Sequence, residues 1–178
     1  MLIPLVIFGT LLAFIVVFNL KSPGKRIEHR IRPLGTLSAE TIQRSISHLL
    51  GPPLLEGNQI EFLENGDEIF PSMLGAIRSA KSSITFETFI YWSGEIGRAF
   101  REALCERSRS GVQVHVLLDW VGSNRMEASA IEEMVRCGVQ VERYHPLRWY
   151  NLTRINNRTH RKILVVDGRI GFTGGVGI

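Results

Sequence analysis

Apolar runs suited to strands alternate along this chain with amphipathic stretches suited to helices, and this order limits the fold more than any other feature. The clearest strand is residues 112–118, a nearly continuous apolar run of the kind that is covered on both faces of a sheet. Other strands are predicted at residues 59–64, 83–92 and 139–144, and helices at residues 67–80, 95–109 and 128–137. This alternation predicts an α/β sandwich with a largely parallel sheet.

Local signals mark the ends of several elements. Ser38 can cap a short amphipathic helix, which Gly51 and the two prolines after it would stop. Gly111 and Gly138 each stand between a predicted helix and a predicted strand, where glycine commonly ends a helix. These signals predict boundaries and carry no chemistry of their own.

The first residues are expected to form a membrane anchor. Residues 2–20 are uncharged and mostly Leu, Ile, Val and Phe, and as a helix they would be about 28 Å long, enough for a bilayer core. Positive charge follows this run and does not precede it, which argues against a cleaved signal peptide. The positive-inside rule then places the following domain in the cytoplasm. We expect a single-pass cell-membrane protein; the alternative is a buried core helix.

The net charge of +4 is unevenly distributed. Residues 21–32 hold five basic residues and one acidic residue, and residues 143–169 hold seven and one. The first basic zone suits anionic lipid headgroups beside the anchor. In the second zone, a basic and aromatic loop at residues 148–158 suits a lipid phosphate or interface, although an ordinary solvated loop is the alternative.

Three parts of the chain are therefore expected. They are an anchor at residues 1–20, a basic juxtamembrane linker with a short helix at residues 21–54, and an α/β domain at residues 55–178. Composition excludes collagen-like, disordered and disulfide-rich classes, since only two residues are cysteines. Cys105 and Cys137 lie in unrelated contexts, and we expect both to be reduced, packed thiols.

The candidate chemistry lies near the end of the chain, in H-R-K-I-L-V-V-D at residues 160–167. In a strand, His160 and Lys162 would project from the same face, while Asp167 with the glycine after it suits a hairpin turn. Gly174 and Gly175 would let backbone N–H groups approach a ligand closely. A neutral imidazole beside an ammonium suits nucleophilic attack at phosphorus, because the ammonium balances charge on the phosphoryl oxygens.

Each of these residues also has an ordinary interpretation. His160 could be a partly buried histidine whose ring nitrogens are hydrogen-bonded. Lys162 could be a solvated strand residue, and Asp167 a turn former. Their joint spacing, followed by two glycines, favours the functional interpretation. Glu87 could be a polar group near this site or an outward-facing strand residue, and Asp119 suits a turn or cap at least as well as a site.

The sequence at this point resembles the HKD motif of the phospholipase D superfamily, and its context resembles the bacterial cardiolipin synthase branch. The matching blocks, in order, are residues 65–77, 84–92, 111–123 and 157–162. The resemblance covers about residues 55–178 and implies one half of a phospholipase D-like α/β/α sandwich, here preceded by a transmembrane helix.

The resemblance also implies a mechanism. One motif histidine attacks the phosphodiester to give a phosphohistidine, and the histidine of a second motif protonates the departing alcohol and later deprotonates the acceptor. By this resemblance His160 is catalytic, Lys162 binds phosphate, and Asp167 orients or supports the motif. Gly174, Gly175 and Glu87 are the expected substrate-binding residues. The implied substrate is a membrane phospholipid resembling phosphatidylglycerol, with no metal and no cofactor.

Two departures from the family pattern bear on activity. Gly177 stands where an asparagine is usual, and the sequence contains one motif where two are usual. We therefore expect the first half of a two-half enzyme, which alone would act only if two copies pair. A homodimeric single-motif phosphodiesterase or nuclease, or an inactive fragment, is the alternative, and a nucleic-acid partner is the less expected one.

Overall fold

The computed structural model describes residues 2–20, 38–51, 55–146 and 158–178. The chain divides into two units, Met1–Ser22 with Leu63–Ile178, and Pro23–Phe62. The basic zone at residues 21–32 and nearly all of the basic and aromatic loop at residues 148–158 lie outside the described residues.

The apolar N-terminal run forms helix α1, Leu2–Leu20. The expected helix is thus confirmed over the predicted residues. Within the part of the chain that the structure describes, however, no helix meets both the length and the hydropathy needed to cross a membrane. The expectation that residues 1–20 span the membrane is therefore not confirmed.

The unit Pro23–Phe62 contains helix α2, Ala39–Leu50. As expected, Ser38 caps this helix, its side chain accepting a hydrogen bond from the Thr41 N–H, and Gly51 ends it with a φ of 84°. The strand predicted for residues 59–64 is wrong, since these residues pair with no strand in the described sheet. Alternating apolar residues need a partner strand to be buried, and Phe62 is 89% exposed.

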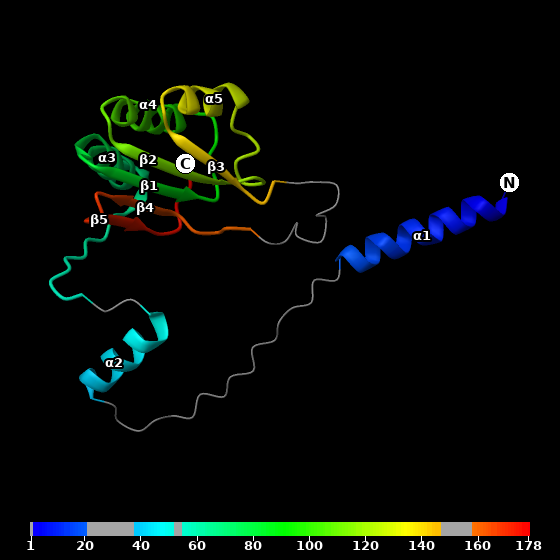
Figure 1. The fold of residues 1–178 in the computed structure, drawn as a ribbon, viewed down its shortest axis with the longest axis horizontal. Helices are drawn as coiled ribbons and strands as arrows, with labels where there is room; N and C mark the ends of the chain where they lie inside the picture. Colours follow the sequence, from blue (N-terminus) through cyan, green and yellow to red (C-terminus); the bar gives the residue numbers. More distant parts are fainter. Residues whose placement is uncertain (1, 21–37, 52–54, 147–157) are drawn as a thin grey trace. The chain divides into compact units, whose positions relative to one another are not determined.

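The sheet has five strands in the order β3-β2-β1-β4-β5 (Figure 1). The strands are β1 Ser83–Thr88, β2 Gln113–Asp119, β3 Gln140–Tyr144, β4 Ile163–Val166 and β5 Ile170–Thr173. Strands β1, β2 and β3 are parallel, and β4 runs antiparallel to both β1 and β5. The expected α/β class is confirmed, with a mixed sheet whose edge is an antiparallel hairpin.

Three helices cover one face of this sheet (Figure 1). They are α3 Asn65–Ser79, α4 Glu95–Arg109 and α5 Ala128–Arg136. Among residues 63–146 and 158–178 no helix covers the other face, so the described part of the domain has two layers and not the expected α/β/α three. The positions in β1 that point away from the helices are accordingly polar or half-buried.

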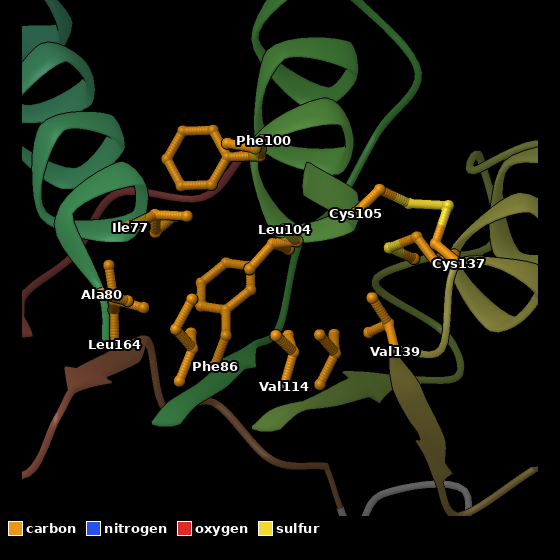
Figure 2. Close-up of a cluster of buried hydrophobic side chains, with 14 of the residues drawn as sticks. Ile77, Ala80, Phe86, Phe100, Leu104, Cys105, Val114, Cys137, Val139 and Leu164 are labelled. Carbon is orange, nitrogen blue, oxygen red and sulfur yellow. A yellow bond between two sulfur atoms is a disulfide. The ribbon is translucent and has the colours of Figure 1, made fainter. Parts of the chain in front are cut away.

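The core lies between the helices and the sheet. Alternate residues of the central strand, Ile84 and Phe86, point toward the helices and are buried. Helix α4 contributes Phe100 and Leu104, and helix α3 contributes Ile77, all fully buried (Figure 2). The two phenylalanine rings stack with centroids 5.9 Å apart. This packing fixes the direction of β1, whose carboxyl end leads into the candidate site.

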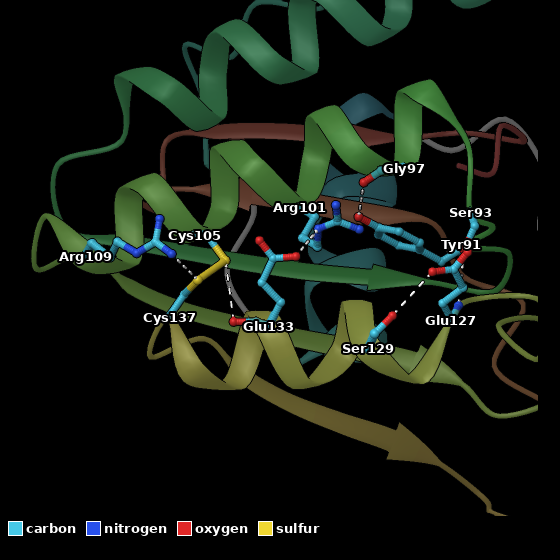
Figure 3. A network of polar contacts seen from close by, with 10 residues as sticks. All are labelled: Tyr91, Ser93, Gly97, Arg101, Cys105, Arg109, Glu127, Ser129, Glu133 and Cys137. Carbon is cyan, nitrogen blue, oxygen red and sulfur yellow. Dashed lines mark hydrogen bonds and ion pairs between the residues drawn. A yellow bond between two sulfur atoms is a disulfide. The ribbon is translucent and has the colours of Figure 1, made fainter.

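Helices α4 and α5 are joined along their shared seam by a disulfide and an ion pair (Figure 3). Cys105 on α4 and Cys137 at the end of α5 form the disulfide, so the expectation of two reduced thiols is corrected. Their sequence separation of 32 gave no sign of this, because the contact arises only when the two helices pack side by side. Farther along the seam, Arg101 Nε lies 2.9 Å from Glu133 Oε2.

Strand β1 ends at Thr88, four residues before the predicted end of the strand. The chain then turns, and the hydroxyl group of Tyr91 donates a hydrogen bond to the Gly97 carbonyl in α4 at 2.7 Å. The Trp92 N–H donates to the Ile178 carbonyl at 2.8 Å. The run after Thr88 is therefore a loop and not a strand, and within it Tyr91 is buried against α4.

Candidate active site

The two central motif side chains, His160 and Lys162, meet just before strand β4. Lys162 Nζ lies 3.3 Å from His160 Nδ1 and donates a hydrogen bond to the His160 carbonyl at 3.1 Å. The strand begins at Ile163, later than expected, because its partner β1 offers pairing only as far as Glu87. The two side chains lie on the same side of the chain, as expected, although in the segment before the strand and not within it.

The ring of Phe89 packs beside this pair. Its centroid lies 4.6 Å from that of the His160 imidazole, and the Lys162 ammonium lies 5.6 Å from the same phenyl centroid. The phenyl ring thus faces both polar groups, and an ammonium at this distance from a ring face is electrostatically attracted to it. Phe89 was not predicted as a site residue, because the apolar run around it indicated the interior of a strand.

The Glu87 carboxylate fixes the segment that carries the motif. Its Oε1 accepts a short hydrogen bond from the Thr159 hydroxyl and pairs with Arg161 Nε at 3.1 Å. These partners flank His160 on both sides in the sequence. Glu87 therefore lies near the site, as one of its two interpretations expected, and its described contacts are with protein groups.

Asp119, at the end of β2, holds the same segment from a second direction. Its side chain is fully buried, Oδ1 accepts the N–H groups of Val121 and Gly122 at 2.9 and 3.1 Å, and Oδ2 accepts the Thr159 N–H at 3.1 Å. Arg158 Nη1 lies 3.9 Å from Oδ1. Asp119 is thus a turn residue, as expected. It also supports the segment that carries the motif, a role that was not predicted from the sequence.

Asp167 lies at the opposite end of β4 from His160 and Lys162. With a φ of 53°, it forms the hairpin turn with Gly168. Its carboxylate accepts the backbone N–H groups of residues 81–83 at 2.8–2.9 Å and the hydroxyl of Ser82. The structure therefore does not bring Asp167 together with His160, and it places the carboxylate where it joins the hairpin to the start of β1.

These hydrogen bonds make stability depend on the charge of Asp167. The backbone N–H group of Ser83, followed by those of Lys81 and Ser82, lowers the pKa of the carboxyl well below its ordinary value. A depressed pKa in the folded state contributes stability that is present above the unfolded pKa, about 3.9, and is lost as pH falls below it.

We predict that Asp167→Asn lowers the melting temperature at pH 7, because an amide offers one acceptor oxygen where the carboxylate offers two. Asparagine tolerates the positive φ, so the turn itself is preserved. The difference from the unmodified protein should shrink when melting is followed below pH 4. A difference that is equal at both pH values would show that the charge of Asp167 is not responsible.

The glycines after the motif lie at the same end of the hairpin as Lys162. Thr173 pairs with Ile163, so Gly174 and Gly175 follow beside the residues that precede β4. Both are exposed, with open space where a side chain would project. Gly177 differs, because a Cβ there would lie 2.7 Å from the Cβ of Ile90. The asparagine usual at this position in the resembled pattern would therefore require a shift of the loop.

No group of three or more histidine, cysteine or acidic side chains among the described residues could hold a metal ion. A cleft of about 440 Å³ opens between the loop after β1 and the helices α4 and α5, with Trp92, Arg98 and Glu127 among its lining residues. His160 and Lys162 do not line it. Among the described residues, the candidate chemistry lies with the exposed His160 and the half-buried Lys162, just beyond the carboxyl end of β1.

The sequence and the fold can be compared with known proteins. Residues 73–178 match the family described as "Cardiolipin synthase, PLD-like domain". Cardiolipin synthase 1 of Bacillus anthracis is 35% identical over 158 residues, which are 87% of this chain and 31% of that protein. Cardiolipin synthase B of Salmonella typhi is 42% identical over 123 residues, 68% of this chain and 30% of that protein. The chain thus spans about a third of the length of these relatives.

Among solved structures, the phospholipase D family member Nuc from Salmonella typhimurium aligns with a TM-score of 0.46 and 21% identity. This alignment covers 61% of this chain and 63% of Nuc. The family match extends over more than half of the chain and contains all of the motif residues described above. The chain therefore belongs to the family of cardiolipin synthase, phospholipase D-like domains.

Proposed function

We propose that this chain carries the nucleophilic half-site of a phosphatidyltransferase of cardiolipin synthase type. The observation that supports it most directly is the contact of Lys162 Nζ with His160 Nδ1, 3.3 Å apart just beyond the carboxyl end of β1, where His160 is exposed. A phosphodiester can reach an exposed imidazole without rearrangement of the core. The names of the matched relatives supply the class of product.

In the proposed first step, a ring nitrogen of His160 attacks the phosphorus of a phosphodiester. A P–N bond forms, the P–O bond to the leaving alcohol breaks, and that oxygen takes the bonding electron pair and a proton. Lys162 balances the charge on the phosphoryl oxygens. The product is a phosphatidyl-histidine and a free alcohol.

The resting contact between the two side chains must change during this step. An ammonium has donors only, so Nδ1 of His160 is the acceptor in their contact. When a phosphate binds, its oxygens compete for the same ammonium. Transfer of Lys162 to the phosphate frees Nδ1, so that the ring proton can move from Nε2 to Nδ1 through solvent and leave the lone pair of Nε2 free to attack.

The proton for the leaving alcohol in the first step, and the whole of the second step, require groups beyond those described. A second histidine, from the remainder of a longer protein or from a second copy of this chain, would protonate the leaving alcohol and activate the acceptor. With phosphatidylglycerol as both donor and acceptor, the products are cardiolipin and glycerol. Helix α1 exposes large apolar side chains such as Leu5 and Phe8, which supports association of the protein with a lipid surface.

A substrate whose leaving group needs no proton separates the two steps. Bis(p-nitrophenyl) phosphate releases p-nitrophenolate, which is stable near neutral pH, so His160 alone can complete the first step. We expect the protein to release at least one equivalent of p-nitrophenolate per chain. Absence of release above the buffer rate would contradict the proposed role of His160.

Phosphatidylglycerol vesicles then test the lipid specificity. We expect mass spectrometry of the extracted lipids to show cardiolipin when the second histidine is supplied by pairing of chains or by the longer protein. Release of p-nitrophenolate without cardiolipin from the longer protein would leave a phosphodiesterase and remove the synthase assignment.

A further inference from the structure

Phe89 is placed so that one ring contacts both polar groups of the motif. It follows the last residue of β1, its ring lies 4.6 Å from the His160 ring, and the Lys162 ammonium lies 5.6 Å from its centroid. The imidazole therefore has two described neighbours: the phenyl ring, and the ammonium at Nδ1. These two contacts differ in kind, since one is apolar and the other depends on charge.

The position of Phe89 is itself fixed by the loop after β2. A side chain at Gly122 would collide with the carbonyl oxygen of Phe89 and would lie 3.1 Å from its ring atom Cδ2, so the two backbones are in direct contact. The same Gly122 N–H donates to Asp119, whose other carboxylate oxygen holds Thr159. The buried carboxylate of Asp119 thus holds Gly122, which lies against Phe89, and Thr159, which precedes His160, so it supports both sides of the contact between Phe89 and His160.

We propose that Phe89 is a positioning residue that keeps the His160 imidazole in its attacking orientation when Lys162 moves to the phosphate of the substrate. This inference rests on the proposed function, in which the ammonium must serve the phosphoryl oxygens. At that moment the hydrogen bond to Nδ1 is lost, and the phenyl contact is the one that remains. A phosphate does not compete for an apolar ring contact, so the imidazole stays oriented.

The variant Lys162→Met removes the ammonium from the imidazole, as binding of a phosphate is proposed to do, and it can be studied without substrate. The full chain, in detergent micelles with 13C-labelled histidine, would show the imidazole signals of its five histidines, and His160→Gln identifies those of His160. A phenyl ring this close shifts the imidazole protons away from the positions of exposed histidines. In Lys162→Met we expect the His160 signals to keep this shift, because Phe89 still holds the ring.

The double variant Lys162→Met/Phe89→Leu should lose the shift, while Lys162→Met/Phe89→Tyr should retain it because tyrosine presents the same ring. Phe172→Leu is the matched control, since Phe172 is a half-buried phenylalanine on β5 that packs against the core. Combined with Lys162→Met, it should leave the His160 signals where they are.

Kinetics with Lys162 present give a second test. We expect Phe89→Leu to lower the rate constant for the first release of p-nitrophenolate from bis(p-nitrophenyl) phosphate by about 10- to 100-fold, with the half-saturating substrate concentration nearly unchanged. A loosely held nucleophile is less well aligned with the phosphorus, although substrate binding is retained. Phe89→Tyr should restore this rate constant, and Phe172→Leu should retain it.

Collapse of the shift in Lys162→Met alone would overturn the proposal, because the lysine and not Phe89 would then hold the ring. An unchanged rate constant for the first release of p-nitrophenolate in Phe89→Leu would overturn it as well. If the unmodified protein releases no p-nitrophenolate, the proposed function fails, and the spectra of the lysine variants still decide what holds the imidazole.

Discussion

We expect His160→Gln to abolish release of p-nitrophenolate from bis(p-nitrophenyl) phosphate, and His115→Gln to leave it unchanged. Glutamine keeps polarity and approximate size but lacks a nucleophilic ring nitrogen, so the P–N bond cannot form. Loss of a nucleophile that forms a covalent intermediate commonly costs on the order of 10⁴- to 10⁶-fold in rate. We therefore expect the His160 variant to match the rate in buffer.

His115 is the matched control because it is also an exposed histidine of the same sheet. It lies in β2, where it pairs in register with Thr85 of β1 and Gln140 of β3. The melting temperatures of both variants should stay near that of the unmodified protein, which separates loss of chemistry from loss of fold. Equal loss of activity in the two variants would point to a general effect of removing an imidazole from the sheet.

We expect Asp119→Ala to lower the free energy of unfolding by about 3 to 5 kcal/mol, because it leaves three backbone N–H groups without their acceptor. The fully buried side chain allows no water to replace the carboxylate unless the site opens. Since one of these groups belongs to Thr159, the segment carrying His160 should also loosen. Urea unfolding followed by circular dichroism measures the first effect, and release of p-nitrophenolate measures the second.

Two further variants serve as comparisons for Asp119→Ala. Asp119→Asn retains Oδ1 as an acceptor for the turn and loses one acceptor, so its loss of stability should be intermediate. Asp67→Ala removes an exposed carboxylate from the first turn of α3 and should cost less than about 1 kcal/mol. If Asp119→Ala were no less stable than Asp67→Ala, the buried carboxylate would not support the site as described.

Elements whose signal is local were predictable from the sequence. Helix α4 has the predicted bounds, and α2 lies between the predicted cap residues Ser38 and Gly51. The strand predicted at residues 59–64 failed because alternation cannot show whether a partner strand exists. Strand β1 was predicted too long because apolar aromatic residues pack equally well in a buried loop, as Tyr91 does against Gly97.

In the candidate site, too, the features with a local sequence signal were predictable and the contacts between distant segments were not. The spacing of His160 and Lys162 predicted their contact, since two residues in extended backbone lie on the same side. Contacts between distant segments could not be predicted from the sequence. Examples are the hydrogen bond from the Thr159 N–H to the Asp119 carboxylate and the ring contact between Phe89 and His160. They depend on where β1, β2 and the motif segment end relative to one another, which only the packed sheet determines.

The central claim is that His160 forms a covalent bond to phosphorus. The most direct test is to react the protein with bis(p-nitrophenyl) phosphate, quench it under alkaline conditions that preserve P–N bonds, and map the digested peptides by mass spectrometry. We predict an acid-labile nitrophenylphosphoryl adduct on His160, absent in His160→Gln and present in His115→Gln. An adduct on another residue, or release of p-nitrophenolate without any adduct at His160, would contradict this account.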